Sequence, residues 1–458
     1  MKNRQIDLTS GPIVKHLLKL AAPTIGASFM QMAYNLTDMF WLGNMGEDAV
    51  ASVGAASFFT WFGASLMLCT RIGAEIGVSQ SLGRKEPFNA LRFVHNSLIW
   101  ATLLSLFLSV TVLIFASKLI GFFKIPSDFV SIEGTNYLKI SALSFVFWFV
   151  NPTFAGIYNG MGNSRLAFRY LSSGVILNII IDPLFIYGAG PVPAMGVSGA
   201  AWATVLSQFV VWTIFVYRFI IRQEMMNLHL RKFIFDWKIS KRIFQAGIPV
   251  AAESALFSVF AMVLAKMVAT FGAIAIAVQS IGSQIEALSW MTSQGFSTAL
   301  GSFTGQNFGA GKFYRFKAGY RYTMMIGAIL GISVSLLFLL FGENIFSIFL
   351  NAPESIKLGG LYLKIIAVSQ VFMIFEITSR GAFNGISKPI PPSLTGILFT
   401  GLRIPIAFFA STILLFGLSG IWWTISLTSV VKGIILPIWL IFVFKNLHQP
   451  LPIHNCTK

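Results

Sequence analysis

Long apolar segments follow one another along nearly the whole chain, and short polar connections separate them. Each segment holds about 20 or more mostly apolar residues, which is the length that an α-helix needs to cross a bilayer. Where polar residues occur inside a segment, they recur at spacings of three and four, the period of a helix. The pattern predicts twelve transmembrane helices, near residues 15–42, 50–76, 93–118, 137–160, 167–188, 195–221, 243–270, 274–303, 320–342, 360–384, 393–416 and 418–445.

The first six segments match the last six residue by residue. Because each copy holds an even number of helices, the second copy must enter the membrane from the same side as the first, which makes the copies parallel repeats. Duplicated membrane halves of this kind are typical of transporters that rock about a central site. The matching residues are Pro23, Gly46, Ala49 and Gln80 with Pro249, Gly272, Ala275 and Gln306; Asn159-Gly160 with Asn384-Gly385; and Gly196, Gly199 and Trp202 with Gly417, Gly420 and Trp423.

The composition supports a protein that lies almost entirely in lipid. Of its 458 residues, 55% are hydrophobic and 11% are charged, whereas a soluble protein carries about 25% charged residues. We therefore expect an all-α integral membrane fold of two pseudo-symmetric six-helix bundles. The expected limits are 1–222 for the N-lobe, 223–242 for a basic cytoplasmic linker and 243–458 for the C-lobe.

The net charge of +17 comes from 33 Lys and Arg against 16 Asp and Glu. Most of the basic residues fall in the connections that follow even-numbered helices, such as Arg84-Lys85 and Lys312, while the opposite connections are short and neutral, acidic or mixed. This distribution is the positive-inside pattern, and it predicts a multi-pass plasma-membrane protein with both termini in the cytoplasm. No basic patch is left over for nucleic acid.

Other classes of protein lack support in the sequence. Cys69 lies inside a predicted span and Cys456 near the C-terminus, so a disulfide between them is not expected. The five histidines are scattered without metal-ligand spacing, and no span carries a nucleophile–base pair or a metal-hydrolase motif. We expect a monomeric transporter without a cofactor, not an enzyme, whose first apolar segment is a transmembrane helix rather than a signal peptide.

One face of the first predicted helix is polar. Gln31, Asn35 and Asp38 share this face, and Tyr34 lies one turn before Asp38. A charged side chain at the bilayer centre costs at least ~2.5 kcal/mol, so such residues are functional candidates by default. The polar face must therefore look into a cavity or toward another helix, and not toward lipid.

The fifth and sixth helices add matching chemistry. Asn178 and Asp182 are four residues apart on one face of the fifth helix, and Thr204 lies in the sixth. Burial and a neighbouring negative charge both favour the protonated form of a carboxyl, so one of the two aspartates can exchange a proton near neutrality. The same oxygens also suit Na⁺. The alternative for Asp182 is a solvated helix end, because Pro183 and a Gly-rich loop follow.

The repeat confines these acids to the first copy. Under the same alignment, Asp38 corresponds to Leu264, Asn178 to Arg403 and Asp182 to Ala407. Duplication thus supplied the scaffold, and one copy carries this chemistry.

The second half has charges of its own. The eighth helix carries a polar face, and Glu253 lies in the seventh helix. Internal ion pairing, for example of Glu286 or Glu376 with Arg403, would lock helices together without transport function. A role in transport stays open beside it. The polar face consists of Gln279, Ser283 and Glu286.

Several motifs together resemble the multidrug and toxic compound extrusion (MATE) transporters. They are Gln31-Met-Ala-Tyr34-Asn35-Leu-Thr-Asp38 with Gly43, Gln80-Ser-Leu-Gly83 with Gln306-Asn-Phe-Gly309, Asn178-Ile-Ile-Ile-Asp182-Pro183, and Gly247-Ile-Pro249. The likeness covers essentially the whole chain. It implies a twelve-helix exporter of organic cations and other amphipathic compounds, driven by inward H⁺ or Na⁺.

The resemblance also implies residue roles. In the branch that carries these acids, an N-lobe proton or Na⁺ site consists of Asp38, Asn178, Asp182 and Thr204, and the adjoining substrate cavity is lined by Gln31, Tyr34, Asn35 and Tyr137. The first helix would bend at Pro23. Another branch couples through C-lobe carboxylates, but Glu253 follows Pro249 more closely than that branch requires, which favours the N-lobe. The alternative in the same superfamily is a flippase for a lipid-linked precursor.

Overall fold

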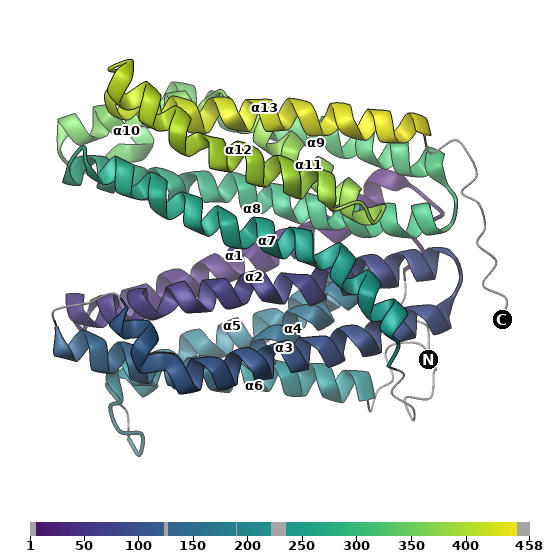
Figure 1. Cartoon of the computed structure of the whole chain (residues 1–458), viewed down its shortest axis with the longest axis horizontal. Helices are drawn as coiled ribbons and strands as arrows, with labels where there is room; N and C mark the ends of the chain where they lie inside the picture. The colour runs from purple at the N-terminus through teal and green to yellow at the C-terminus, as the bar shows by residue number, and fades with distance from the viewer. Residues whose placement is uncertain (1–5, 123–126, 189, 221–234, 447–458) are drawn as a thin grey trace. The chain divides into compact units, whose positions relative to one another are not determined.

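The computed structural model describes residues 6–122, 127–188, 190–220 and 235–446, and these residues form thirteen α-helices, one π-helical turn and no strand (Figure 1). The predicted all-α class is confirmed. The first six predicted spans each become one helix, and the first five helices extend past the start of the apolar segment that predicted them. The six helices are α1 (Ile13–Gly43), α2 (Glu47–Gly83), α3 (Pro87–Gly121), α4 (Asp128–Gly160), α5 (Ser164–Tyr187) and α6 (Gly196–Ile220).

The second repeat follows the same order with two irregularities. Its helices are α7 (Trp237–Ala269), α8 (Ala273–Gly309), α9 (Phe313–Ser347), α10 (Pro353–Ala367), α11 (Gln370–Gly385), α12 (Ile390–Phe408) and α13 (Gly417–Asn446). The π-helical turn Phe409–Ile413 extends α12 and completes the eleventh predicted span.

The tenth predicted span is not one straight helix. It consists of α10 and α11, which meet at an angle of 50°. At the break, the Ser369 hydroxyl donates to the Ile366 carbonyl at 2.9 Å, and the Gln370 amide donates to the same carbonyl at 3.4 Å. Side chains that bond a nearby carbonyl compete with the helical ladder, which explains a bend inside an apolar run.

Two long helices are too polar to pass a simple test for membrane spans. Nine helices of the described chain are long and apolar enough, or ten when the bent pair counts as one span. Besides the two short helices of that pair, only α1 and α8 fall outside the nine, and both carry a polar face. Because lipid does not accept such a face, these two helices are where a site is expected.

Close contacts among the described residues divide the chain into two units. Unit 1 contains Leu20–Ala255 with the described part of Met1–Asp7, and unit 2 contains Leu8–Lys19 with Leu256–Lys458 as far as described. The start of α1 thus groups with unit 2, and the first half of α7 with unit 1. The lobe limits 1–222, 223–242 and 243–458 stay a prediction, and residues 223–234 of the linker lie outside the described residues.

Glycine allows the central helices of each unit to approach closely. A Cβ on Gly156 of α4 would lie 2.6 Å from the Arg71 carbonyl of α2, and a Cβ on Gly381 of α11 would lie 2.2 Å from the Ser297 carbonyl of α8. The two glycines occupy equivalent positions in the repeats. Small residues at helix crossings allow the backbones to pack together in a membrane, so both copies use the same seam.

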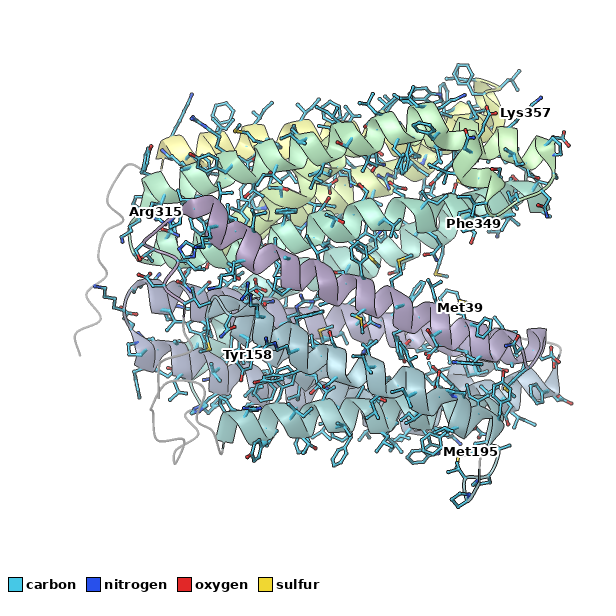
Figure 2. All side chains as sticks on the ribbon, turned by 180° about the vertical axis from the view of Figure 1, so that it is seen from behind. Met39, Tyr158, Met195, Arg315, Phe349 and Lys357 are labelled. Atoms are coloured by element: carbon cyan, nitrogen blue, oxygen red, sulfur yellow. The ribbon has the colours of Figure 1, made fainter. Side chains whose placement is uncertain are left out.

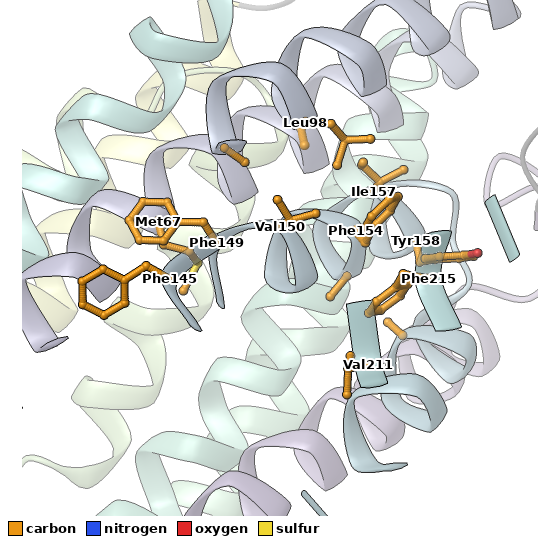
Figure 3. Close-up of a cluster of buried hydrophobic side chains, with 14 of the residues drawn as sticks. Met67, Leu98, Phe145, Phe149, Val150, Phe154, Ile157, Tyr158, Val211 and Phe215 are labelled. Atoms are coloured by element: carbon orange, nitrogen blue, oxygen red, sulfur yellow. The ribbon is translucent and has the colours of Figure 1, made fainter. Parts of the chain in front are cut away.

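Aromatic side chains fill the core of unit 1 (Figure 3). Phe154 of α4 stacks on Phe215 of α6 with ring centres 5.1 Å apart and planes 9° apart, and Tyr158 and Tyr170 add edge contacts. Such close packing, rather than water exclusion, holds helices together in lipid. The tightly packed core of α2–α6 fixes the positions of α5 and α6, which carry polar residues of the predicted site.

Candidate functional site

Two aspartates meet inside unit 1. Asp182 of α5 has no exposed surface, and Asp38 of α1 is half-buried. Their carboxyl groups lie close enough for one to donate a hydrogen bond to the other when it carries a proton. In the described part of the chain, no Lys or Arg forms an ion pair with either group. Met39, the residue after Asp38, marks this turn of α1 in Figure 2.

Three of the four carboxyl oxygens of this pair lack donors. Both oxygens of Asp182 and Oδ1 of Asp38 are buried, and no group of the described residues donates a hydrogen bond to them. A buried ionised carboxylate without a partner is costly. A proton or a small cation between the two groups would remove that cost.

Tyr34 links the acids to α6. Its hydroxyl lies 2.9 Å from the Thr204 hydroxyl and within hydrogen-bonding reach of Asp38. A phenol has one proton to donate, so when Tyr34 donates to Asp38, Thr204 donates to Tyr34. The predicted residues Asp38, Asp182 and Thr204 are thus joined through a residue predicted to line the cavity.

A cavity of about 40 Å³ is lined by residues that lie one helical turn before each acid, Tyr34 in α1 and Asn178 in α5. This volume is roughly three times the space that one water needs. It contains the predicted residues Asn178, Gln31 and Tyr34, and it also contains two side chains that the sequence did not single out, Ser207 and Gln208. The full lining is Gln31, Tyr34, Trp148, Gly174, Val175, Asn178, Thr204, Ser207 and Gln208. The available signal was helical spacing, because Ser207 and Gln208 follow Thr204 by three and four residues.

The other predicted residues of unit 1 differ in how close they lie to the Asp38–Asp182 pair. Tyr137 is close enough to both acids to interact with them electrostatically, and it packs beside Leu42. Asn35 is exposed, accepts only a 3.3 Å hydrogen bond from Gln31, and is not among the cavity residues. Pro23 lies inside α1, which continues unbroken through it.

The polar face of α8 lies in unit 2 and forms a hydrogen-bonded ladder. Trp422 donates to Gln279 at 2.7 Å, and the Gln279 amide donates to Ser283 at 3.4 Å. The Tyr362 hydroxyl donates to Glu286 at 3.4 Å. Glu253, in contrast, is buried on the part of α7 that belongs to unit 1, and so it is not grouped with this face.

Ion pairing in the second half is confirmed, but the predicted partner is wrong. Glu376 pairs with Lys432 at 3.0 Å and with Arg380 at 3.1 Å. Arg403 instead donates to Thr428 at 2.8 Å and to Ser429 at 2.7 Å. No carboxylate of the described residues lies within ion-pair distance of Arg403. Helical spacing accounts for the Glu376–Arg380 pair, which is four residues apart on α11, but it could not predict the bonds of Glu376 and Arg403 to α13.

The fold is the duplicated helical bundle of a multi-pass membrane protein, and its first copy holds two carboxyl groups that form no ion pair among the described residues. The MatE family model matches residues 23–184 and again 249–409, once in each repeat. The chain therefore belongs to the MatE family of transporters.

Individual relatives agree with the family. The chain is 28% identical over 413 residues to the probable multidrug resistance protein NorM of Thermotoga maritima, covering 90% of this chain and 88% of that one. It is 24% identical over 452 residues to the FAD transporter of Shewanella oneidensis, covering 95% of each. A crystal structure of MATE in the bent conformation superposes with a TM-score of 0.91 at 23% identity, covering 98% of this chain and 99% of that one.

Proposed function

We propose that this transporter exports organic cations and other amphipathic compounds in exchange for H⁺ or Na⁺, with the Asp38–Asp182 pair as the coupling site. One observation carries the proposal: both oxygens of the fully buried Asp182 lack a donor among the described residues, beside a second carboxyl. A group in that state must bind a proton or a cation. The name of the Thermotoga relative, a multidrug resistance protein, supports the class of cargo.

Coupling follows from competition for one pair of charges. When one H⁺ or Na⁺ binds to the pair, the repulsion between Asp38 and Asp182 is relieved and a cationic compound loses one of its two countercharges. When the ion leaves, the acids attract cargo again. Two ligands that share one site in this way are coupled without a long-range relay. For Na⁺, the oxygens of Asn178 and Thr204 complete a set of hard ligands.

The moving part in this proposal is α1. Within unit 1, α1 lacks the close packing that joins α2–α6 to one another, and most of its second half is exposed or half-buried. Pro23 removes one hydrogen bond of its ladder, which favours a bend. The relative solved in a bent conformation supports such a motion. We place both termini in the cytoplasm of a plasma-membrane monomer, as the positive-inside pattern suggests.

The proposal is tested by efflux from proteoliposomes with an imposed H⁺ or Na⁺ gradient, each applied alone. Asp38→Asn should abolish gradient-driven efflux while the protein still folds. Asp48→Asn is the matched control, because Asp48 is an exposed acid of the same half. Gradient-driven efflux by Asp38→Asn at the wild-type rate would contradict the proposal, and the gradient that drives the wild type identifies the ion.

The FAD transporter among the relatives raises a second candidate, an anionic dinucleotide cargo. An anion needs basic partners, and the cavity of unit 1 is lined by neutral residues beside two acids. The buried bases Lys432 and Arg403 lie in unit 2 and are already bonded. We therefore prefer the cationic cargo. Saturable FAD transport by the proteoliposomes, insensitive to Asp38→Asn, would reverse that preference.

A further inference from the structure

Arg403 is a buried cationic side chain, and the repeat gives it an equivalent position in the first half of the chain. It is 8% exposed in unit 2, and its guanidinium donates to the Thr428 hydroxyl at 2.8 Å, the Ser429 hydroxyl at 2.7 Å and the Ile425 carbonyl at 3.3 Å. Three acceptor groups of α13 thus hold one guanidinium. A planar, weakly hydrated cation suits such neutral acceptors.

The equivalent residues of the first repeat surround the cavity. Asn178 stands where the second repeat has Arg403. The spacing that relates Trp202 to Trp423 brings Thr204, Ser207 and Gln208 onto the three residues that bind the guanidinium, and all three line the cavity with Asn178. The cavity of unit 1 therefore lies where unit 2 holds its guanidinium.

Two of the polar side chains around the cavity, Asn178 and Ser207, lack partners in the described part of the chain. The Gln208 side-chain oxygen, in contrast, accepts one hydrogen bond from Asn151 at 3.0 Å and has a second lone pair free to accept another. The short side chain of Asn178 is 1% exposed, and both its amide nitrogen and its oxygen are buried without a partner among the described residues. The Ser207 hydroxyl is also buried without a partner among the described residues. Buried polar groups in proteins are nearly always satisfied, so these atoms point to a ligand that carries hydrogen-bonding groups.

The size of the cavity limits the ligand. About 40 Å³ is room for roughly three waters, which is comparable to the four heavy atoms of a guanidinium. Because the cavity is partly open, a larger amphipathic molecule can place its polar head there and extend its apolar part outward.

We propose that this cavity binds an N–H-bearing cationic head group, of guanidinium or ammonium type, from the exported compound. Ser207, Gln208 and Asn178 accept its N–H groups, and Asp38 with Asp182 supplies the countercharge. Arg403 is the tethered counterpart of this head group in the second repeat. The inference rests on the proposed function and adds the class of cargo and the residues that select it.

The selectivity test uses two cations with the same body. Benzylguanidinium offers N–H donors, and benzyltrimethylammonium has the same charge without them. In calorimetric titrations of the purified full chain, benzylguanidinium should bind at least about tenfold tighter, as expected for one charge-assisted hydrogen bond. Ser207→Ala and Gln208→Leu together should lower the ratio at least about threefold, and Asn178 with the two carboxyl groups accounts for the preference that remains. Ser429→Ala, in the second repeat, should leave it unchanged.

Equal affinities in the wild type, or a ratio that survives both cavity substitutions, would overturn the inference. Because these titrations use no ion gradient, they are independent of the Asp38→Asn efflux test. Efflux that depends on Asp38 together with equal affinities for the two probes would leave the proposed function intact and remove only the head-group site.

A second variant fills the cavity from within. Asn178→Arg copies the second repeat, so its guanidinium should occupy the cavity, leave the thermal unfolding midpoint within a few degrees of the wild type, and reduce benzylguanidinium affinity at least about tenfold. Ile180→Arg is the control, because Ile180 is 58% exposed on the same helix and an arginine there should lower the midpoint. An unfolded Asn178→Arg, or one that still binds benzylguanidinium at wild-type affinity, contradicts the proposal.

Discussion

The two repeats share a scaffold and differ in how they treat charge. In the second repeat, Leu264 and Ala407 are buried together in an apolar cluster. At the equivalent positions, the first repeat places Asp38 and Asp182. The second repeat does hold buried charges, but Glu376 and Lys432 are paired at 3.0 Å. We therefore distinguish a structural charge, which is held in an ion pair, from an exchangeable charge, which in the proposed function binds and releases a cation.

The distinction rests on the cost of desolvation. Two opposite charges in contact offset much of the cost of leaving water, whereas two like charges do not. The Glu376 network therefore stabilises one arrangement of α11 and α13. In the proposed function, the Asp38–Asp182 pair requires a proton or cation, so its preferred arrangement changes with occupancy. A transporter needs one element of each kind.

The largest expected effect comes from breaking the ion pairs of Glu376. Glu376→Gln leaves Lys432 buried without its countercharge and should destabilise the protein by about 3–5 kcal/mol, seen as a large fall of the thermal unfolding midpoint in detergent. Replacing both residues, Glu376→Met with Lys432→Met, should recover part of the loss, because an apolar pair of similar volume replaces an ion pair at little cost, while Arg380 loses its bond to Glu376.

Asp182→Asn should not lower the thermal unfolding midpoint in the way that Glu376→Gln does. It removes a buried charge that has no donor among the described residues, so the unfolding midpoint should stay or rise while gradient-driven efflux is lost. If Asp182→Asn lowers the midpoint as much as Glu376→Gln does, the division into structural and exchangeable charge is wrong.

The shared scaffold predicts equal effects at equivalent glycines. Gly156→Ala and Gly381→Ala each force a Cβ against a carbonyl of the neighbouring helix. Overpacking of this kind costs about 1–3 kcal/mol, and both variants should lower the midpoint by similar amounts. Gly121→Ala is the control, because nothing lies within 4 Å of a Cβ at that position. A strong effect in only one repeat would show that the seams are not equivalent.

The fold was predictable because lipid imposes simple rules. Apolar length marked every span, and the duplication set their order. The bend between α10 and α11 was not predictable, since Ser369 and Gln370 lie in a mostly apolar run and act only through hydrogen bonds to Ile366. A local competition for one carbonyl leaves no trace in hydropathy.

The site was predictable in part for the same reason. Buried acids are so costly in lipid that Asp38 and Asp182 stood out, and helical spacing placed Asn178 beside them. Ser207 and Gln208 were missed because a serine and a glutamine are unremarkable in a membrane helix until the cavity is seen. Arg403 was assigned a carboxylate partner on charge alone, whereas its bonds depend on the approach of α12 to α13.

The smallest expected effect comes from removing the Tyr34 hydroxyl, which joins Asp38 to Thr204. Tyr34→Phe gives the first repeat the residue that the second repeat has at Phe260, and it removes the 2.9 Å contact with Thr204. We expect a loss of about 0.5–1.5 kcal/mol in stability and a several-fold rise in the ion concentration that gives half-maximal efflux, with gradient coupling preserved. Tyr320→Phe is the matched control, since it removes a 2.8 Å contact with Ser379 in unit 2; it should lower stability by a similar amount and leave the ion dependence unchanged. An equal shift of the ion dependence in both variants would mean that Tyr34 acts through helix packing rather than through Asp38.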